Sequence, residues 1–134
     1  MTLNIRVIAP DKTVWDATAE EVILPSSTGQ LGILTGHIPL LTALDIGVMR
    51  VRIDKEWIPI VLLGGFAEVE NNKITILVNG AEEATDIDPE TAQQNLDEAS
   101  KLLTEATSSR AQIEATQKIR KARARLQAIA TLSS

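Results

Sequence analysis

The stretch GFAEVENNKITILV, residues 65–78, decides the fold class. On each side of Asn71-Asn72 apolar and polar residues alternate, which is the period of a half-buried strand. Asn tolerates the positive φ that a two-residue type I′ turn requires. These residues therefore predict a β-hairpin that turns at Asn71-Asn72.

Upstream of this hairpin the chain also has the pattern of short strands. Further predicted strands cover 3–7, 21–25, 47–53 and 57–62, with a turn at 54–56. Pro25 and Ser26 are expected to end the second of them. Gly64-Gly65 lies between two strands, where a bend or bulge is favoured over a ligand site. Many short strands with frequent turn signals indicate an all-β sandwich or barrel.

Downstream of the hairpin the period changes to that of helices. Asp88 can cap a helix, Pro89 suits its first position, and Glu90 favours its positive end. A second helix is expected after Thr107, with Ser109 and Gln112 as its capping box. Spacings of four and three residues predict the packed positions 92, 96, 99, 103 and 106, then 115, 119, 122, 126 and 129.

Two helices joined by a short polar turn predict an antiparallel hairpin. The expected fold class is therefore α+β with two domains: an all-β sandwich of antiparallel strands over residues 1–85, and a two-helix hairpin over residues 86–134. Because the apolar stripe of the hairpin is narrow and rich in Ala, the hairpin is expected to be marginal alone and able to detach.

Composition excludes several functional classes. The 134 residues contain no Cys and a single His, so thiol catalysis, disulfides and a multi-histidine metal site are ruled out within one chain. Aromatic residues make up only 2%, and the net charge is −5, which argues against nucleic-acid binding. The longest apolar run, Ile58–Leu63, is far shorter than the roughly 20 residues of a membrane-spanning helix, so a soluble protein is expected.

Charge is unevenly distributed along the chain. Residues 82–105 carry one basic and eight acidic side chains, whereas residues 106–134 carry six basic and one acidic side chain. The basic residues of the second helix avoid its apolar stripe; they are Lys118, Arg120, Lys121, Arg123 and Arg125. They form either a contact for an acidic protein surface or a solvated helix face with partners inside the chain.

The segment from Gly29 to Leu40 is the densest cluster of special residues. It has no Lys-Ser/Thr pair after its glycines, so it is a weak match to a phosphate-binding loop. His37 has no carboxylate close to it in sequence, which weighs against catalysis. The remaining interpretations are turn glycines with a capping or surface histidine, or a rigid exposed loop that contacts another protein.

The order of these motifs resembles the epsilon-subunit family of F-type rotary ATP synthases, in its cyanobacterial or chloroplast form. The resemblance covers the whole chain. It rests on Leu3-Asn4-Ile5, Gly29–Leu34 with Gly36-His37, Asp45-Ile46-Gly47, Gly64–Ala67, Ile74–Asn79, Asp86–Pro89, the basic second helix and Ser133-Ser134.

This resemblance implies a mechanical and regulatory subunit with no catalytic residues and no metal site. In the family the sandwich binds the gamma subunit and the membrane c-ring, and couples rotation to proton flow. The contact loop carries over to Gln30, Leu31, Gly32, Gly36 and His37. Many bacterial relatives have an acidic residue in place of Gln30. The implied location is peripheral on the thylakoid membrane, through protein partners, on its cytoplasmic or stromal side.

The hairpin of the family inhibits ATP hydrolysis. When extended, its basic second helix approaches an acidic segment of the beta subunit in the catalytic alpha/beta head. That role carries over to Arg120, Lys121, Arg123 and Arg125, with Lys118 beside them. The resemblance thus favours a protein partner for the basic residues.

Some bacterial relatives bind ATP on the folded hairpin through an Ile/Leu-Asp-x-x-Arg-Ala motif. Here the positions are Ile87, Asp88, Thr91 and Ala92, with Thr91 in place of Arg. Because the guanidinium is missing, ATP binding is expected to be weak or absent, and no cofactor is expected. Two other classes stay open: a free nucleotide-binding regulator, and a small enzyme that uses His37.

Overall fold

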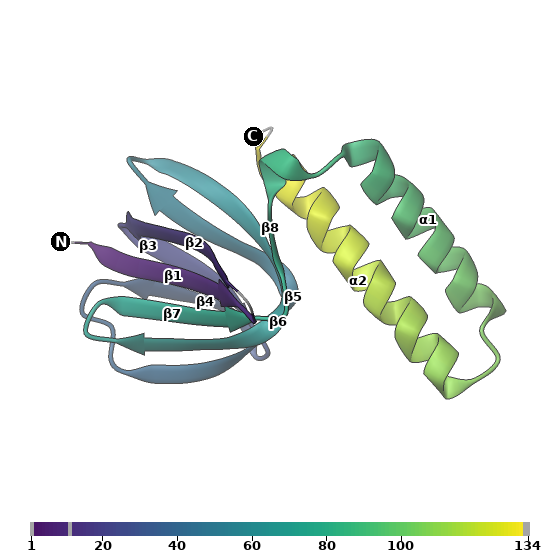
Figure 1. Cartoon of the computed structure of the whole chain (residues 1–134), viewed down its shortest axis with the longest axis horizontal. Coiled ribbons are helices and arrows are strands. Elements are labelled where there is room, and N and C mark those ends of the chain that lie inside the picture. The colour runs from purple at the N-terminus through teal and green to yellow at the C-terminus, as the bar shows by residue number, and fades with distance from the viewer. Residues whose placement is uncertain (1, 11, 133–134) are drawn as a thin grey trace.

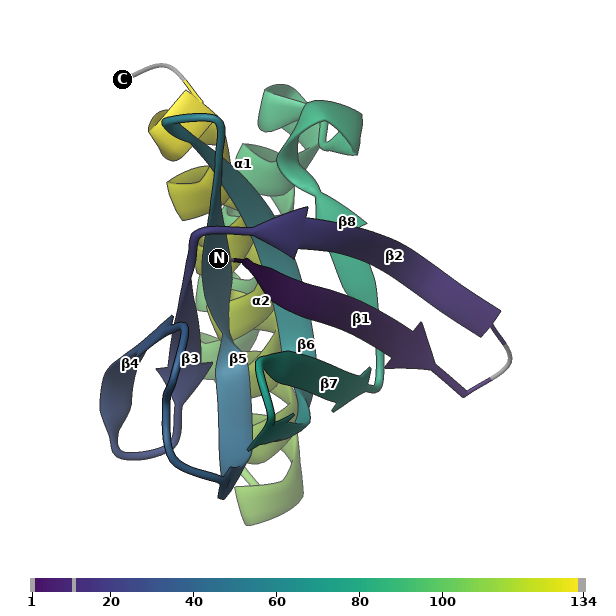
Figure 2. The ribbon, with the colours of Figure 1, turned by 90° about the vertical axis from the view of Figure 1, so that its left-hand side faces the viewer.

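A computed structural model describes residues 2–10 and 12–132. The ends of the predicted domain ranges, Met1 and Ser133-Ser134, lie outside these residues. Figure 1 shows a β-sandwich with a pair of long helices on one side of it, and Figure 2 shows the helices behind the strands. The predicted α+β fold is confirmed, with antiparallel pairing throughout the sandwich except for one parallel strand pair.

Within the described residues, eight strands form one continuous hydrogen-bonded sheet that folds into the sandwich. Its order is β2-β1-β7-β6-β5-β3-β4, with β8 paired to β6. The strands are β1 (Leu3–Ala9), β2 (Lys12–Ala19), β3 (Glu21–Ser26), β4 (Gly29–Leu34), β5 (Leu40–Ile53), β6 (Glu56–Glu70), β7 (Lys73–Val78) and β8 (Ala81–Glu83). The parallel pair joins β1, at the start of the β-rich segment, to β7, near its end.

Two tight turns follow from residues that accept positive φ. Asn71 and Asn72 have φ of 51° and 62°, and they connect β6 to β7 as predicted. Asp54 and Lys55 have φ of 51° and 70° and connect β5 to β6 in the same way. Both are two-residue hairpin connections, which fix the register of the long strands.

Strand β3 extends one residue further than the sequence indicated, because Pro25 lies inside it. Its pairing with β5 is irregular between Ile23 and Ser26, so the missing N–H of proline removes no regular ladder bond there. The prediction that Pro25 ends the strand was therefore wrong.

Gly64 and Gly65 form a bend in β6, which lets the strand take part in both layers of the sandwich. Their φ values are +84° and +156°, a region that favours glycine. Before them Ile60 and Leu62 lie in the core, and after them Ala67 and Val69 do, so the inward side changes from even to odd positions. The long strands β5 and β6 curve in Figure 1, and the expected bend at this glycine pair is present.

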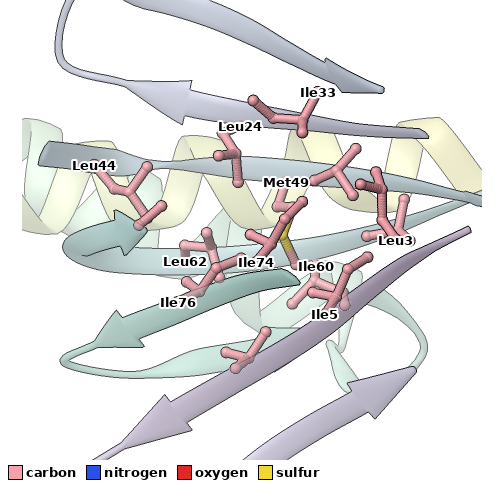
Figure 3. Packing of buried hydrophobic residues seen from close by; sticks show 14 of the residues in the cluster. Leu3, Ile5, Leu24, Ile33, Leu44, Met49, Ile60, Leu62, Ile74 and Ile76 are labelled. Carbon is pink, nitrogen blue, oxygen red and sulfur yellow. The ribbon is translucent and has the colours of Figure 1, made fainter. Parts of the chain in front are cut away.

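The main core lies between the layers of the sandwich. Figure 3 shows aliphatic side chains from both layers pointing toward each other, with Met49 among them. The largest fully buried side chains are Leu3, Ile5, Leu24, Ile33, Met49, Ile60, Leu62, Ile74, Ile76, Val7, Val22 and Val51. All of these side chains belong to strands, so the burial that stabilises the sandwich core does not involve the hairpin.

The helical part begins with a short 3₁₀ helix, Ala84–Asp86, followed by α1 (Pro89–Glu105) and α2 (Ser109–Leu132). Asp88 caps α1 as predicted, because its Oδ1 accepts the Glu90 N–H at 3.2 Å. The predicted cap of α2 is off by one position: Ser108, not Ser109, accepts the Ala111 N–H through Oγ at 3.1 Å.

Candidate interaction surfaces

The first candidate surface contains Gln30, Leu31 and Gly32, which the sequence placed in a loop. They belong instead to β4, an edge strand that pairs with β3. Gln30 is exposed, and its Oε1 accepts a hydrogen bond from Arg50 Nη2 at 3.3 Å. The guanidinium of Arg50 also lies 6.0 Å from the centre of the Trp57 ring. Gln30 is thus presented by a strand and supported by β5.

Gly36 and His37 lie in the turn after β4. Gly36 has φ of +83° and donates its N–H to Asn72 Oδ1 at 2.7 Å. The His37 N–H donates to the Leu34 carbonyl at 3.2 Å, and His37 Nδ1 lies 2.7 Å from the Ile38 carbonyl oxygen. The turn is therefore fastened to the β6–β7 connection, and none of these contacts joins His37 to a carboxylate.

Three apolar side chains stand exposed around this turn. Leu34, Ile38 and Leu41 are 53%, 74% and 70% exposed. Single exposed leucines are ordinary, but three within eight positions of one chain segment indicate a contact surface. Sequence reasoning missed them because it emphasised the glycines and His37. We call these residues, together with Gln30 and His37, the β4-turn surface.

A second apolar surface crosses four strands on the outside of the sandwich. Ala43 pairs with Phe66, Phe66 with Leu77, and Leu77 with Ile8. Cross-strand partners project to the same face, so these side chains form one row, the apolar row. Phe66 is 56% and Leu77 53% exposed, and both line a shallow depression of about 500 Å³.

A third surface joins α2 to the sheet. Ala124 and Ala128 are buried against Val48 and Val61 of β5 and β6, and Ala84 joins the same cluster. Val48 pairs with Val61, and both point away from the sandwich core. This contact explains why the run 58–63 is apolar at every position: one side faces the core and the other faces α2.

The helices contact each other mostly as predicted. Ala92 and Ala99 of α1, and Ala115, Ile119 and Ala122 of α2, are buried. Leu103 is instead exposed, and Leu126 and Ile129 are only half-buried. The sequence predicted a single apolar stripe along the second helix. In the structure α2 has two buried faces, because it lies between α1 and the sheet (Figure 1).

The five basic residues of α2 do not form one equivalent set. Lys118, Arg120 and Arg123 are exposed, whereas Lys121 and Arg125 are half-buried. Lys118, Lys121 and Arg125 line a groove of about 260 Å³ between the helices, together with Glu98. A basic surface is thus present on α2, and Arg125 stands at its inner margin.

Arg125 makes a two-pronged ion pair with Glu82 of β8. Its Nε lies 2.8 Å from Oε1, and its Nη2 lies 2.7 Å from Oε2. The hydrogen bonds to Glu82 raise the pKa of Arg125, the attraction between the charges adds to this, and burial opposes it. In the folded hairpin Arg125 therefore contacts a carboxylate of its own chain, rather than belonging to a free basic face.

The residues of the degenerate nucleotide motif have structural contacts of their own. Ile87 packs against the α2–sheet cluster, and Ala92 of α1 is buried. Asp88 uses Oδ1 to cap the helix, and its Oδ2 accepts the Thr91 hydroxyl at 2.7 Å. Both oxygens of Asp88 are thus engaged by the first turn of α1.

The described ranges 2–10 and 12–132 contain no helix that combines the length and apolar character needed to span a membrane. Within the same ranges, His, Asp and Glu side chains do not gather into a group that could hold a metal ion.

Comparison with known proteins identifies both parts of the chain. Residues 2–84 match the family model "ATP synthase, Delta/Epsilon chain, beta-sandwich domain", and residues 85–130 match "ATP synthase, Delta/Epsilon chain, long alpha-helix domain". The chain is 75% identical over 134 residues to the chloroplastic ATP synthase epsilon chain of Pyropia yezoensis, covering 100% of both. It is 64% identical over 131 residues to the ATP synthase epsilon chain of Thermosynechococcus vestitus, covering 96% of this chain and 95% of the relative.

Two solved structures share the fold. A chain of the Euglena gracilis mitochondrial ATP synthase, described as "OSCP/F1/c-ring in rotational state 1", matches with a TM-score of 0.83 at 18% identity, over 99% of this chain and 82% of the other. A chain of the Tetrahymena thermophila mitochondrial ATP synthase, from its "central stalk/cring", matches with a TM-score of 0.65 at 14% identity, over 96% and 97%.

Proposed function

The chain belongs to the ATP synthase delta/epsilon chain family, with epsilon chains of chloroplasts and cyanobacteria among its relatives, and we propose that it is a component of the central stalk. It is a subunit of ATP synthase and is not itself catalytic. Its proposed work is to bind gamma and the c-ring, to couple rotation to proton flow, and to inhibit ATP hydrolysis through its C-terminal helices. The observation that carries this proposal is a rigid sandwich with two exposed apolar surfaces, beside a hairpin held by small residues.

The sandwich, residues 1–85, is the proposed stalk-binding domain. The apolar row of Ala43, Phe66, Leu77 and Ile8 is the surface we assign to gamma. A flat sheet face with exposed large apolar side chains is suited to a stable protein contact, because binding removes that surface from water. Phe66 lies within the row and is the expected anchor.

The β4-turn surface is the proposed c-ring contact. The hydrogen bonds of Gly36 and Arg50 hold the turn and Gln30 in place, so little order has to be gained on binding. Leu34, Ile38 and Leu41 supply apolar contact area, and Gln30 supplies a neutral polar group. The proposed contact is therefore made by packing and hydrogen bonds, with no acidic side chain at position 30.

The hairpin, residues 86–134, is the proposed regulatory domain. Its contact with the sheet uses alanine side chains, which bury little area each, so a small difference in contacts shifts the hairpin between two positions. In the extended position the basic residues of α2 would face an acidic surface of the alpha/beta head. Lys118, Arg120, Lys121 and Arg123 are the groups we assign to that contact, and Arg125 joins them after it leaves Glu82.

Tight ATP binding is not part of the proposed function. Asp88 is engaged by Glu90 and Thr91, and Arg125 is engaged by Glu82. A nucleotide on the hairpin would have to displace these contacts without the guanidinium that Thr91 replaces. The proposed location is peripheral on the thylakoid membrane, on its cytoplasmic or stromal side, held there by the protein partners.

Deletion of residues 86–134 in the assembled complex tests the proposal. Co-purification with gamma should be retained, because the apolar row is unchanged, and ATP hydrolysis by the complex should rise. Unchanged hydrolysis in a complex that has retained the shortened chain would reject the inhibitory role. Loss of gamma binding with a folded sandwich would reject the assignment of the two domains.

A further inference from the structure

The contact between Glu82 and Arg125 joins the two domains beside the apolar contact of α2 with the sheet. Glu82 is fixed in β8, where it pairs with Val61 of β6, and Arg125 lies on α2 next to Ala124. Their side chains are only 31% and 23% exposed. Among the ion pairs that the structure describes, this is the one that connects the hairpin to the sandwich.

The Glu82–Arg125 pair has a two-pronged, partly buried geometry, which is expected to contribute measurably to the docking of α2 on the sandwich. Isolated surface ion pairs contribute little, but a two-pronged arginine–carboxylate pair with partial burial is the recognised exception. Both carboxylate oxygens are engaged at 2.8 Å and 2.7 Å. The apolar part of the same contact is small, because α2 presents Ala124 and Ala128 to Val48 and Val61.

We propose that the Glu82–Arg125 pair is a latch, which holds α2 against the sandwich and keeps Arg125 away from any other carboxylate while the hairpin is folded. Its regulatory meaning rests on the function proposed above. Glu82 occupies the edge of the Arg125 guanidinium that carries Nε and Nη2. A second carboxylate must therefore displace Glu82 before it can bind that edge. Undocking of the hairpin therefore requires release of the Arg125 fork from Glu82.

The latch is not opened by loss of the charge on Arg125 at ordinary pH. The hydrogen bonds to Glu82 raise the pKa of Arg125, so the guanidinium stays protonated. Opening requires competition by another anion, screening by salt, or movement of α2.

The full chain allows a direct test because it contains no Cys. Cysteines introduced at Thr18 of β2 and Gln117 of α2, both exposed, carry spin labels, and the distribution of distances between them reports the docked and displaced hairpin. Glu82→Gln and Arg125→Gln should each raise the displaced population, on the order of fivefold. Arg123→Gln, an exposed neutral substitution on the same helix, is the matched control and should leave the distribution unchanged.

The double variant separates a latch from two independent effects. If the residues act through each other, Glu82→Gln with Arg125→Gln should displace the hairpin no more than either single change. Hydrogen exchange in β1 and β7 confirms that the sandwich stays folded in every variant. The latch is overturned if both single variants keep the original distances, or if their effects add.

The assembled complex then distinguishes this inference from the proposed function. A latch variant that displaces the hairpin of the chain alone, yet leaves ATP hydrolysis by the complex unchanged, supports the latch and contradicts the inhibitory role. A variant that alters hydrolysis without displacing the hairpin of the chain alone contradicts the latch.

Discussion

Arg125 of α2 donates hydrogen bonds to both carboxylate oxygens of Glu82 in β8, 43 positions away in sequence. The contact lies beside Ala124 and Ala128, so a charged fork and a small apolar patch together dock the hairpin on the outer face of β5 and β6. One residue of a basic helix is thereby turned inward, while Arg120 and Arg123 remain exposed. The same helix carries both a docking face and a surface open to partners.

Enlarging the apolar patch should undock α2. Ala128 is 0% exposed and lies against Val48 and Val61, so Ala128→Leu places extra atoms where the contact has no room. Such overpacking costs about 1–3 kcal/mol, which is large for so small a contact. Hydrogen exchange of α2 amides should become faster, while the strands keep their protection. Ala130→Leu, on the exposed side of the same helix, is the control, and equal exchange in both variants would contradict the expectation.

Replacing the second glycine of the bend should destabilise the sandwich itself. A Cβ on Gly65 would lie 2.0 Å from the Leu77 carbonyl oxygen, and the residue has φ of +156°. We expect Gly65→Ala to lower the free energy of unfolding by about 3 kcal/mol, as measured by urea denaturation. Gly32→Ala is the control, because a Cβ there meets no atom within 4 Å. Equal stabilities of the two variants would disprove this role of Gly65.

A charge within the apolar row should weaken the proposed gamma contact. Phe66 is more than half exposed, so Phe66→Glu should leave the chain folded and reduce its affinity for gamma about tenfold or more. Co-purification with gamma measures the effect. Leu102→Glu introduces the same charge at an exposed apolar position of α1 and should bind normally. If Phe66→Glu also binds normally, the row is not the gamma surface.

The exposed basic residues of α2 should matter most at low salt. Replacing Lys118, Arg120 and Arg123 with Ala should weaken inhibition of ATP hydrolysis more at low than at high ionic strength, since salt screens exposed charges. Hydrolysis by the assembled complex at two salt concentrations gives the comparison. Arg110→Ala is the control, because Arg110 pairs with Glu114 in the first turns of α2. The absence of any effect at low salt would favour a merely solvated helix face.

The isolated chain should not bind ATP tightly. Isothermal calorimetry should show no saturable heat, because Asp88 already accepts two hydrogen bonds and position 91 lacks a guanidinium. Thr91→Arg restores the cation and tests whether its absence is the reason. Tight, saturable binding by the unchanged chain would refute this expectation and would support a free nucleotide-binding regulator.

Local signals in the sequence predicted both helices and strands β1, β3, β5, β6 and β7, but not strands β2, β4 and β8 or the contacts between elements. The alternation around Asn71-Asn72 and the cap at Asp88 each depend on neighbours in sequence, and both were predictable. Strand β4 was missed because its two glycines and lack of alternation resemble a loop. A strand held by pairing with β3 needs no strong propensity of its own.

The second buried face of α2 was also missed, for a different reason. Alanine is compatible with solvent and with a tight contact, so Ala124 and Ala128 carry little information alone. The available signal was in the partner strand: the run Ile58–Leu63 has apolar side chains on both faces, which requires cover on both. The Glu82–Arg125 pair had no such signal, because it joins elements whose relative position the sequence leaves open.

The place of Glu82 also determines how far the hairpin travels. Only Glu83 separates the residue from the 3₁₀ helix Ala84–Asp86 that connects the domains, so the ion pair acts close to the pivot of a long arm. Helix α1 has 17 residues and reaches about 25 Å from its start. A rotation about this connection that separates Arg125 from Glu82 therefore moves the far turn of the hairpin further than it moves the ion pair, because the turn lies at the end of the arm.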